Sequence, residues 1–192
     1  MRGLKVTREH NEGRACERES FGIDGIRKVI DAALKLEAGI VKFVDTDLGG
    51  AIAELADKSK NDPKKLALWA AECAENVLHL FENKHPADNR PRAAIEAGRA
   101  WVSGGLTMSD ARAAAFASHA AARDAVDEAA CAAARAAGHA AATAHVAGHA
   151  VHAAAYAAKA AAFAADSGTA GARVAEEREW QWQLLLAYSD TL

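Results

Sequence analysis

The chain has 192 residues, of which 51% are hydrophobic and 26% are charged, a balance typical of a globular protein rather than a disordered one. Its 23 basic and 26 acidic residues give a net charge of -3, and the basic residues are scattered, which argues against a nucleic-acid-binding protein. No window approaches the roughly 20 consecutive apolar residues of a membrane-spanning helix, so we expect neither nucleic acid nor a membrane as partner.

The N-terminal residues 1–20 are highly charged and lack a hydrophobic period, which predicts a weakly ordered arm. They also lack the apolar stretch of a secretory signal. The three cysteines, at positions 16, 73 and 131, show no paired CxxC spacing. The lack of a secretory signal and the lack of paired cysteines both favour a cytoplasmic protein.

Residues 21–192 are predicted to form a single helical domain, because a chain of this length has room for one core.

Two amphipathic helices are predicted after the arm. Residues 23–39 carry apolar side chains at helical spacing. Residues 41–55 continue the same period through Gly49 and Gly50, although two interior glycines cost about 2 kcal/mol relative to alanine. Because the period survives, we predict one helix over 41–55 that can kink at the glycine pair.

The clearest amphipathic stripe follows a loop at residues 58–62. The loop ends in Asp62-Pro63, the order of cap and proline expected at a helix start. The apolar members of the stripe recur at spacings of three and four: Leu66, Trp69, Ala70, Cys73, Val77, Leu80 and Phe81. Residues 85–91 contain two prolines and predict a turn. Residues 94–102 then predict another helix, which two glycines at 104 and 105 close.

A capping box formed by Thr107 and Asp110 predicts the start of the next helix, and residues 124–127 predict its end. Residues 127–165 contain no proline, yet a single helix of that length would far exceed the average of roughly 12 residues. We therefore expect the chain to turn back at Gly138 or Gly148, and we favour Gly148. A last helix is predicted over 172–188.

Alanine dominates the second half of the chain. Residues 111–165 include 32 alanines in 55 positions. Alanine loses no side-chain entropy in a helix, and its small side chain lets helix backbones approach closely. The sequence therefore predicts an all-α fold, a single-domain bundle of about seven or eight helices with an alanine-rich, close-packed C-terminal half.

The histidines of this half are the candidate binding residues: His119, His139, His145, His149 and His152. The last three are spaced by four and three, so they would share one face of an unbroken helix, and an HxxxH pair can hold a divalent metal. A turn at Gly148 would remove that shared face. The alternative interpretation is that the imidazoles are amphipathic spacers that hydrogen-bond to backbone carbonyls or to neighbouring helices at a turn.

An enzyme is not favoured, and no catalytic residue, metal ligand or cofactor is assigned. No HExxH motif is present, and residues 131–165 contain no carboxylate that could act as a base. The three arginines of the alanine-rich half, Arg112, Arg123 and Arg135, are expected to pair with nearby carboxylates rather than bind a ligand. These carboxylates are Asp110, Asp124, Asp127 and Glu128.

Four stretches carry a family resemblance: residues 68–75 (LWAAECAE), 90–97 (RPRAAIEA), 136–150 (AAGHAAATAHVAGHA) and 177–183 (EREWQWQ). In order and spacing they resemble the alanine-rich, all-helical immunity proteins associated with bacterial polymorphic toxin systems. The resemblance covers roughly residues 63–165 and the C-terminal helix, and it does not extend to residues 1–60. It implies a small cytoplasmic protein that neutralises a toxin by binding it, with no catalytic residues.

Three hypotheses about function follow. The first is a non-enzymatic immunity protein whose partner is a cognate toxin domain. The second is a metal-dependent helical protein that uses His139, His145, His149 and His152. The third is a structural or oligomerising helical module, and a homo-oligomer is compatible with each of them.

Overall fold

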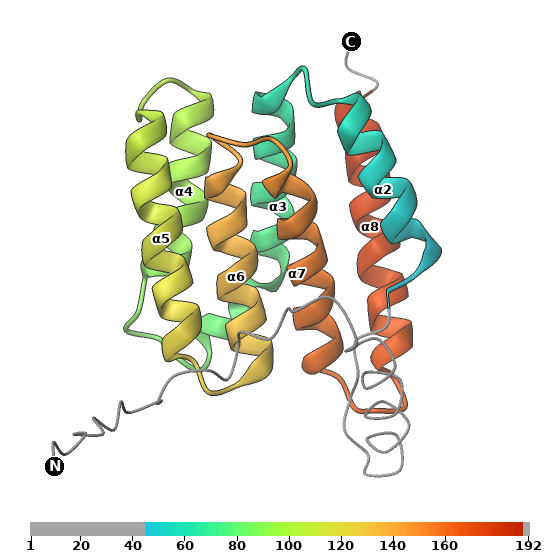
Figure 1. Cartoon of the computed structure of the whole chain (residues 1–192). Helices are drawn as coiled ribbons and strands as arrows, with labels where there is room; N and C mark the ends of the chain where they lie inside the picture. Colours follow the sequence, from blue (N-terminus) through green and yellow to red (C-terminus); the bar gives the residue numbers. More distant parts are fainter. Residues whose placement is uncertain (1–44, 190–192) are drawn as a thin grey trace, which may run out of the picture.

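A computed structural model of the chain describes residues 45–189 (Figure 1). This part is all-α, with seven helices and no strand, as the sequence predicts. The predicted N-terminal arm and the predicted helix over 23–39 lie outside the described residues. The helices are α2 (Asp47–Lys58), α3 (Pro63–Glu82), α4 (Arg90–Val102), α5 (Met108–Asp124), α6 (Glu128–Ala142), α7 (His149–Phe163) and α8 (Ala170–Ser189).

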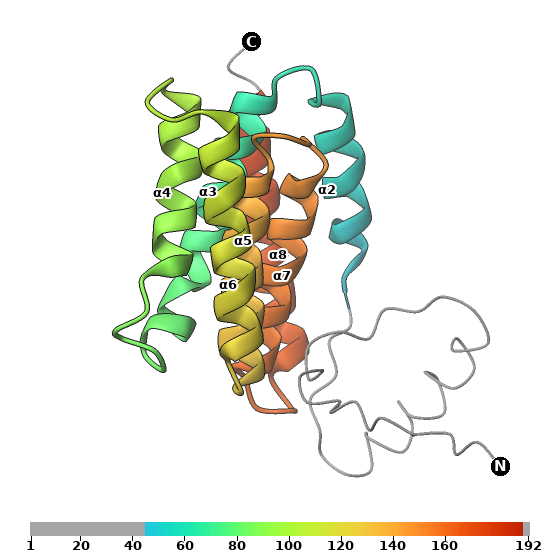
Figure 2. The same cartoon turned by 60° about the vertical axis from the view of Figure 1, so that its left-hand side comes forward.

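Successive helices run antiparallel, joined by short turns, and they form two layers (Figures 1 and 2). One layer holds α5, α6, α7 and α2, and the other holds α4, α3 and α8. Helix α6 is central, because it packs against α3, α4, α5 and α7. None of the described helices combines the length and the apolar character that a membrane span requires.

Local signals in the sequence set several helix boundaries. The side chain of Asp62 accepts a hydrogen bond from the backbone N–H of Lys65, and Thr107 and Asp110 form the predicted capping box at the start of α5. Asp127 caps α6 in the same way. After α4 the chain turns at Gly104, whose φ of 79° favours glycine.

The prediction of a kink at Gly49 and Gly50 was wrong. Helix α2 begins only at Asp47, so both glycines lie in its first turn rather than in its interior. The expected residues 41–44 of this helix lie outside the described part of the chain.

The alanine-rich region after Asp127 is folded into two helices. Helix α6 ends at Ala142, and α7 begins after Gly148, which is its N-cap, so the favoured turn position is confirmed. Gly138 lies inside α6, and the chain does not turn there. A Cβ atom at position 138 would lie 2.6 Å from the ring of His119, so this glycine gives the imidazole room to lie on the α6 backbone.

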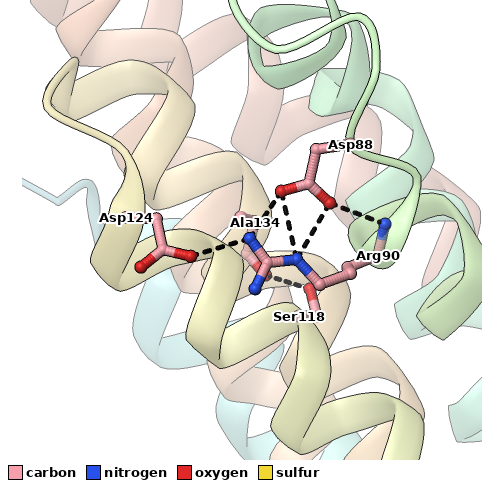
Figure 3. A network of polar contacts seen from close by, with 5 residues as sticks. All are labelled: Asp88, Arg90, Ser118, Asp124 and Ala134. Carbon is pink, nitrogen blue, oxygen red and sulfur yellow. Dashed lines mark hydrogen bonds and ion pairs between the residues drawn. The ribbon is translucent and has the colours of Figure 1, made fainter.

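Helix α6 is the most deeply buried helix of the first layer. Twelve of its 15 residues are buried, and all twelve are alanine, glycine or cysteine. The neighbouring helix α5 is tied to it by Ser118, whose hydroxyl donates to the carbonyl oxygen of Ala134 over 2.8 Å (Figure 3). The predicted close packing of small residues is therefore present in α6.

The other side of the bundle is built from large side chains and buried polar groups. Trp69 of α3 is fully buried, and its indole N–H donates to the carbonyl oxygen of Gln181 over 3.0 Å. The amide of Gln181 donates in turn to the carbonyl of Ala154 at 3.0 Å and to Glu177 at 2.7 Å. This network joins α3, α7 and α8 through hydrogen bonds as well as through apolar contact.

A second polar link fixes the start of α2. The guanidinium of Arg178 is 2% exposed, and it pairs with the carboxylate of Asp45 through an Nε–Oδ1 distance of 2.8 Å. Its Nη1 also donates to Gln181 over 2.9 Å. Burial raises the pKa of the neighbouring Glu177, while hydrogen bonds from Gln181 and Asn76 oppose that rise.

Arg90 holds the end of the bundle where α5 stops. Its guanidinium bonds Asp88 at 2.6 Å and Asp124, at the end of α5, at 2.7 Å (Figure 3). Arg90, the first residue of α4, thereby joins the end of α5 to Asp88 in the loop before α4.

Candidate functional site

The five candidate histidines come from three helices and one turn, and the fold brings them together. His119 lies on α5, His139 on α6, His145 in the turn after α6, and His149 and His152 on α7. They form one contiguous group, which we call the histidine cluster. The predicted three-histidine face of one unbroken helix does not exist, because the chain turns between His145 and His149.

His139 lies at the centre of the cluster. Its ring centroid is 4.9 Å from that of His119, 5.2 Å from that of His149 and 5.3 Å from that of His152. His145 joins through His149, at 5.1 Å. The cluster therefore depends on tertiary packing across α5, α6 and α7.

Two aromatic residues flank the cluster, and a cationic side chain lies over the ring of each. Tyr156 of α7 stacks on His139 at 5.3 Å, and the ammonium of Lys159 lies 4.7 Å from the centre of the tyrosine ring. On α5, the guanidinium of Arg112 lies 5.4 Å from the centre of the Phe116 ring. Phe116 is 60% exposed.

Helical spacing explains why these side chains share a surface. On α5 the residues 112, 116, 119 and 123 follow one another at intervals of three and four, and on α7 so do 149, 152, 156 and 159. The contacts of His139 join both stripes across α6. We call this surface the histidine face; it comprises the histidine cluster and Arg112, Phe116, Arg123, Arg135, Tyr156 and Lys159.

Hydrogen bonding within the cluster is sparse. The Nδ1 atoms of His139 and His149 are 3.1 Å apart, so one ring donates to the other. The Nδ1 atom of His119 is buried without a partner. Within residues 45–189 none of the five imidazoles bonds to a backbone carbonyl, whereas the contact between His139 and His149 joins neighbouring helices at a turn, as the spacer interpretation allows.

Burial keeps the central imidazoles neutral. Loss of solvent lowers the pKa of His139 to about 3, with a further contribution from neighbouring histidines and Arg135. Burial and then the charge of Arg135 lower the pKa of His119 to about 4. The pKa of His149 is lowered for the same first reason. His119, His139 and His149 therefore add no positive charge to the histidine face at neutral pH.

The arginines of the face do not pair as predicted. No described carboxylate lies within ion-pair distance of Arg112, Arg123 or Arg135. The expected partners bond elsewhere: Asp110 to the N-terminus of its own helix, Asp124 to Arg90, and Asp127 to the N-terminus of α6 and to Lys84. Asp110, Asp124 and Asp127 are thus engaged at helix ends, and among residues 45–189 none of them pairs with Arg112, Arg123 or Arg135.

The arrangement is not that of a metal centre. Over the described range no group of three or more histidine, cysteine or acidic side chains converges in a geometry that could hold a metal ion. The imidazoles meet edge to face or in tilted pairs. The metal hypothesis for His139, His145, His149 and His152 gains no support from this geometry.

A concave feature lies between α3, α7 and α8. It is a cleft of about 400 Å³ that includes Trp180, Arg173 and Glu176 in its lining. Arg173 and Glu176 pair with each other at 3.0 Å. Glu177, also in the lining, is bonded to Asn76. Because its charged groups are already paired, this cleft offers less to a charged partner than the histidine face does.

Comparison with known proteins gives one match. A family model described as "Imm-5 like putative immunity protein" matches residues 53–188, a longer stretch than the quoted motifs cover. Neither the search of curated proteins nor that of solved structures gave a match. The matched residues include α3 to α7 in full and nearly all of α8. Since the match extends over more than half of its length, the chain belongs to the Imm-5 like putative immunity protein family.

Proposed function

We propose that this chain is a cytoplasmic immunity protein that neutralises a toxin domain by binding it, without chemistry of its own. The single observation that carries the proposal is the family match over residues 53–188. The surface we assign to binding is the histidine face, with His119, His139, His145, His149 and His152 at its centre.

The structure of this face supports binding rather than catalysis. The face is centred on α6, and the inner surface of this helix packs against other helices. The backbone that supports the face is therefore in place before any partner binds. A preformed surface avoids part of the entropy cost of association. A neutral imidazole can act as a general base, but residues 129–165 contain no carboxylate that could orient one for catalysis.

The test is co-expression of the full chain with the toxin domain encoded by a neighbouring gene. We expect the chain to restore growth, to co-purify with the toxin domain in a fixed ratio, and to release an active toxin when the complex is dissociated. Inactivation by the chain at far less than one equivalent, or a toxin recovered in chemically altered form, would contradict a binding mechanism. Failure of the two proteins to form a complex would contradict the proposal itself.

A further inference from the structure

The histidine face has an unusual charge pattern. Residues 111–123 of α5 and residues 129–165, which cover almost all of α6 and all of α7, contain no acidic residue. Four cations lie on the face: Arg112, Arg123, Arg135 and Lys159. The whole chain has a net charge of -3, so this positive surface is a local feature and not a general property of the protein.

Arginines elsewhere in the bundle are paired. Arg92 bonds Glu82, Arg99 bonds Glu75, and Arg178 bonds Asp45. On the histidine face, by contrast, the Nε and Nη2 atoms of Arg135 and the Nδ1 atom of His119 are buried without any hydrogen-bond partner. Each such unsatisfied group is unfavourable, because the hydrogen bonds it made to water are not replaced. Because these atoms are buried, an acceptor supplied from outside would satisfy them only after the side chain of Arg135 rotates outward to meet it.

These features identify the chemistry of the partner. We propose, on the basis of the function proposed above, that the histidine face binds an acidic patch of the toxin domain, with carboxylates lying against Arg135 and the neighbouring imidazoles. A carboxylate accepts hydrogen bonds from a guanidinium in a fork geometry, and such charge-assisted bonds are about twice as strong as neutral ones. Phe116 and Tyr156, each beside a cation, add the aromatic contacts that dominate binding energy at interfaces.

Two other occupants fit the face less well. A second copy of this chain related by a two-fold axis would place the face against itself, and the like charges of Arg112, Arg123 and Arg135 would then meet. Nucleic acid would need a run of cations that follows the phosphate backbone, commonly 6–10 contacts in tight complexes. Here the four cations are separated by imidazoles and aromatic rings, an arrangement that suits carboxylate side chains on a protein surface.

The experiment measures the affinity of the full chain for the toxin domain of the neighbouring gene by calorimetry at 50 and 300 mM salt. We expect Arg135→Gln to weaken binding about 30-fold or more, because a buried charged donor is lost. Lys159→Gln, at the edge of the face, should mainly slow association and reduce the salt dependence. Thermal melting of each variant reports whether it is folded.

Matched controls remove charges elsewhere. Arg173→Gln and Lys60→Gln remove exposed cations whose partners are three residues away on the same segment, and both should leave the affinity within about twofold. Arg135→Lys keeps a positive charge but not the fork, and it should recover only part of the loss. A third comparison, Arg135→Glu, should give the largest loss because it places an acid against an acid.

The outcomes separate the two proposals. A complex that forms with unchanged affinity and salt dependence for Arg135→Gln and Arg135→Glu would overturn the assignment of this face and leave the immunity function standing. The absence of any complex with the unaltered chain would overturn both. Tight binding of a 20-base-pair DNA duplex that depends on Arg135, or a dimer that Arg135→Gln dissociates, would replace the acidic toxin surface with a different occupant.

Discussion

The two sides of this bundle reach a tightly packed interior by opposite means. Around α6 the buried residues are almost all alanine, and helices approach one another over small side chains. Around α3 and α8 the interior holds Trp69, Phe81 and the polar network of Gln181. The first side is sensitive to added volume, and the second is sensitive to lost volume and lost hydrogen bonds. The comparison shows that burial by itself does not say which substitution a site tolerates.

The largest effect is expected from truncation on the α3–α8 side. Trp69→Ala should lower the free energy of unfolding by about 3–5 kcal/mol, the usual cost of removing a buried aromatic side chain. It also leaves the carbonyl of Gln181 without its donor. Trp180→Ala is the matched control, because Trp180 is 38% exposed and should cost much less. Equal losses in denaturant titrations of the two variants would show that the buried tryptophan is not a special anchor.

The opposite change probes the alanine side. Ala141→Leu on α6 and Ala154→Leu on α7 should each cost about 1–3 kcal/mol by overpacking, because both positions are fully buried among close backbones. Ala93→Leu on the exposed surface of α4 is the control and should change stability by less than about 0.5 kcal/mol. Thermal melts of the buried variants that coincide with that of the unaltered chain would argue against close packing.

A smaller effect is expected from pH. The pKa values of His119 and His139 are lowered on folding, to about 4 and about 3, so below pH 6.5 the unfolded chain binds more protons than the folded one. The contribution of these two histidines to the free energy of unfolding is therefore fully present above pH 6.5, and it is lost as the pH drops toward their folded-state pKa values. Each histidine contributes a slope of at most about 1.4 kcal/mol per pH unit.

Denaturant titrations between pH 7 and pH 4.5 measure this slope. The double variant His119→Gln with His139→Gln should flatten it. His79→Gln, which replaces an exposed histidine of α3, should not. A slope that persists in the double variant would assign the acid sensitivity to groups outside the histidine cluster.

Much of the fold could be predicted from the sequence because the signals are local. The stripe of α3, the cap at Asp62, the capping box at Thr107 and the turn at Gly148 each depend on a few neighbouring residues. The start of α2 was misplaced, because apolar spacing alone does not reveal that the helix begins two residues before the glycine pair.

The burial of polar side chains on α8 could not be predicted from local signals. Arg178 and Gln181 are polar, so an amphipathic pattern assigns them to the surface, and only the contacts with Asp45 and Trp69 show why they are buried. A local signal is the EREWQWQ stretch at residues 177–183, where Arg178 and Gln181 lie three apart on one helix face.

The candidate site was predicted in composition but not in arrangement. The sequence drew attention to the five histidines, and the fold decided which of them touch. His119 and His139 are 20 residues apart, and their contact depends on the space above Gly138. The arginines were assigned wrongly, because spacing cannot show that Asp110 and Asp127 are already engaged as helix caps.

The central position of α6 has a consequence for how the chain meets a partner. Exposing the amides of a helix that touches four others requires most of the bundle to come apart, so local opening there should cost nearly as much as global unfolding. The backbone of α6 thus behaves as a fixed template, and the reshaping needed for a tight fit falls on its surface side chains and on the molecule that docks against it.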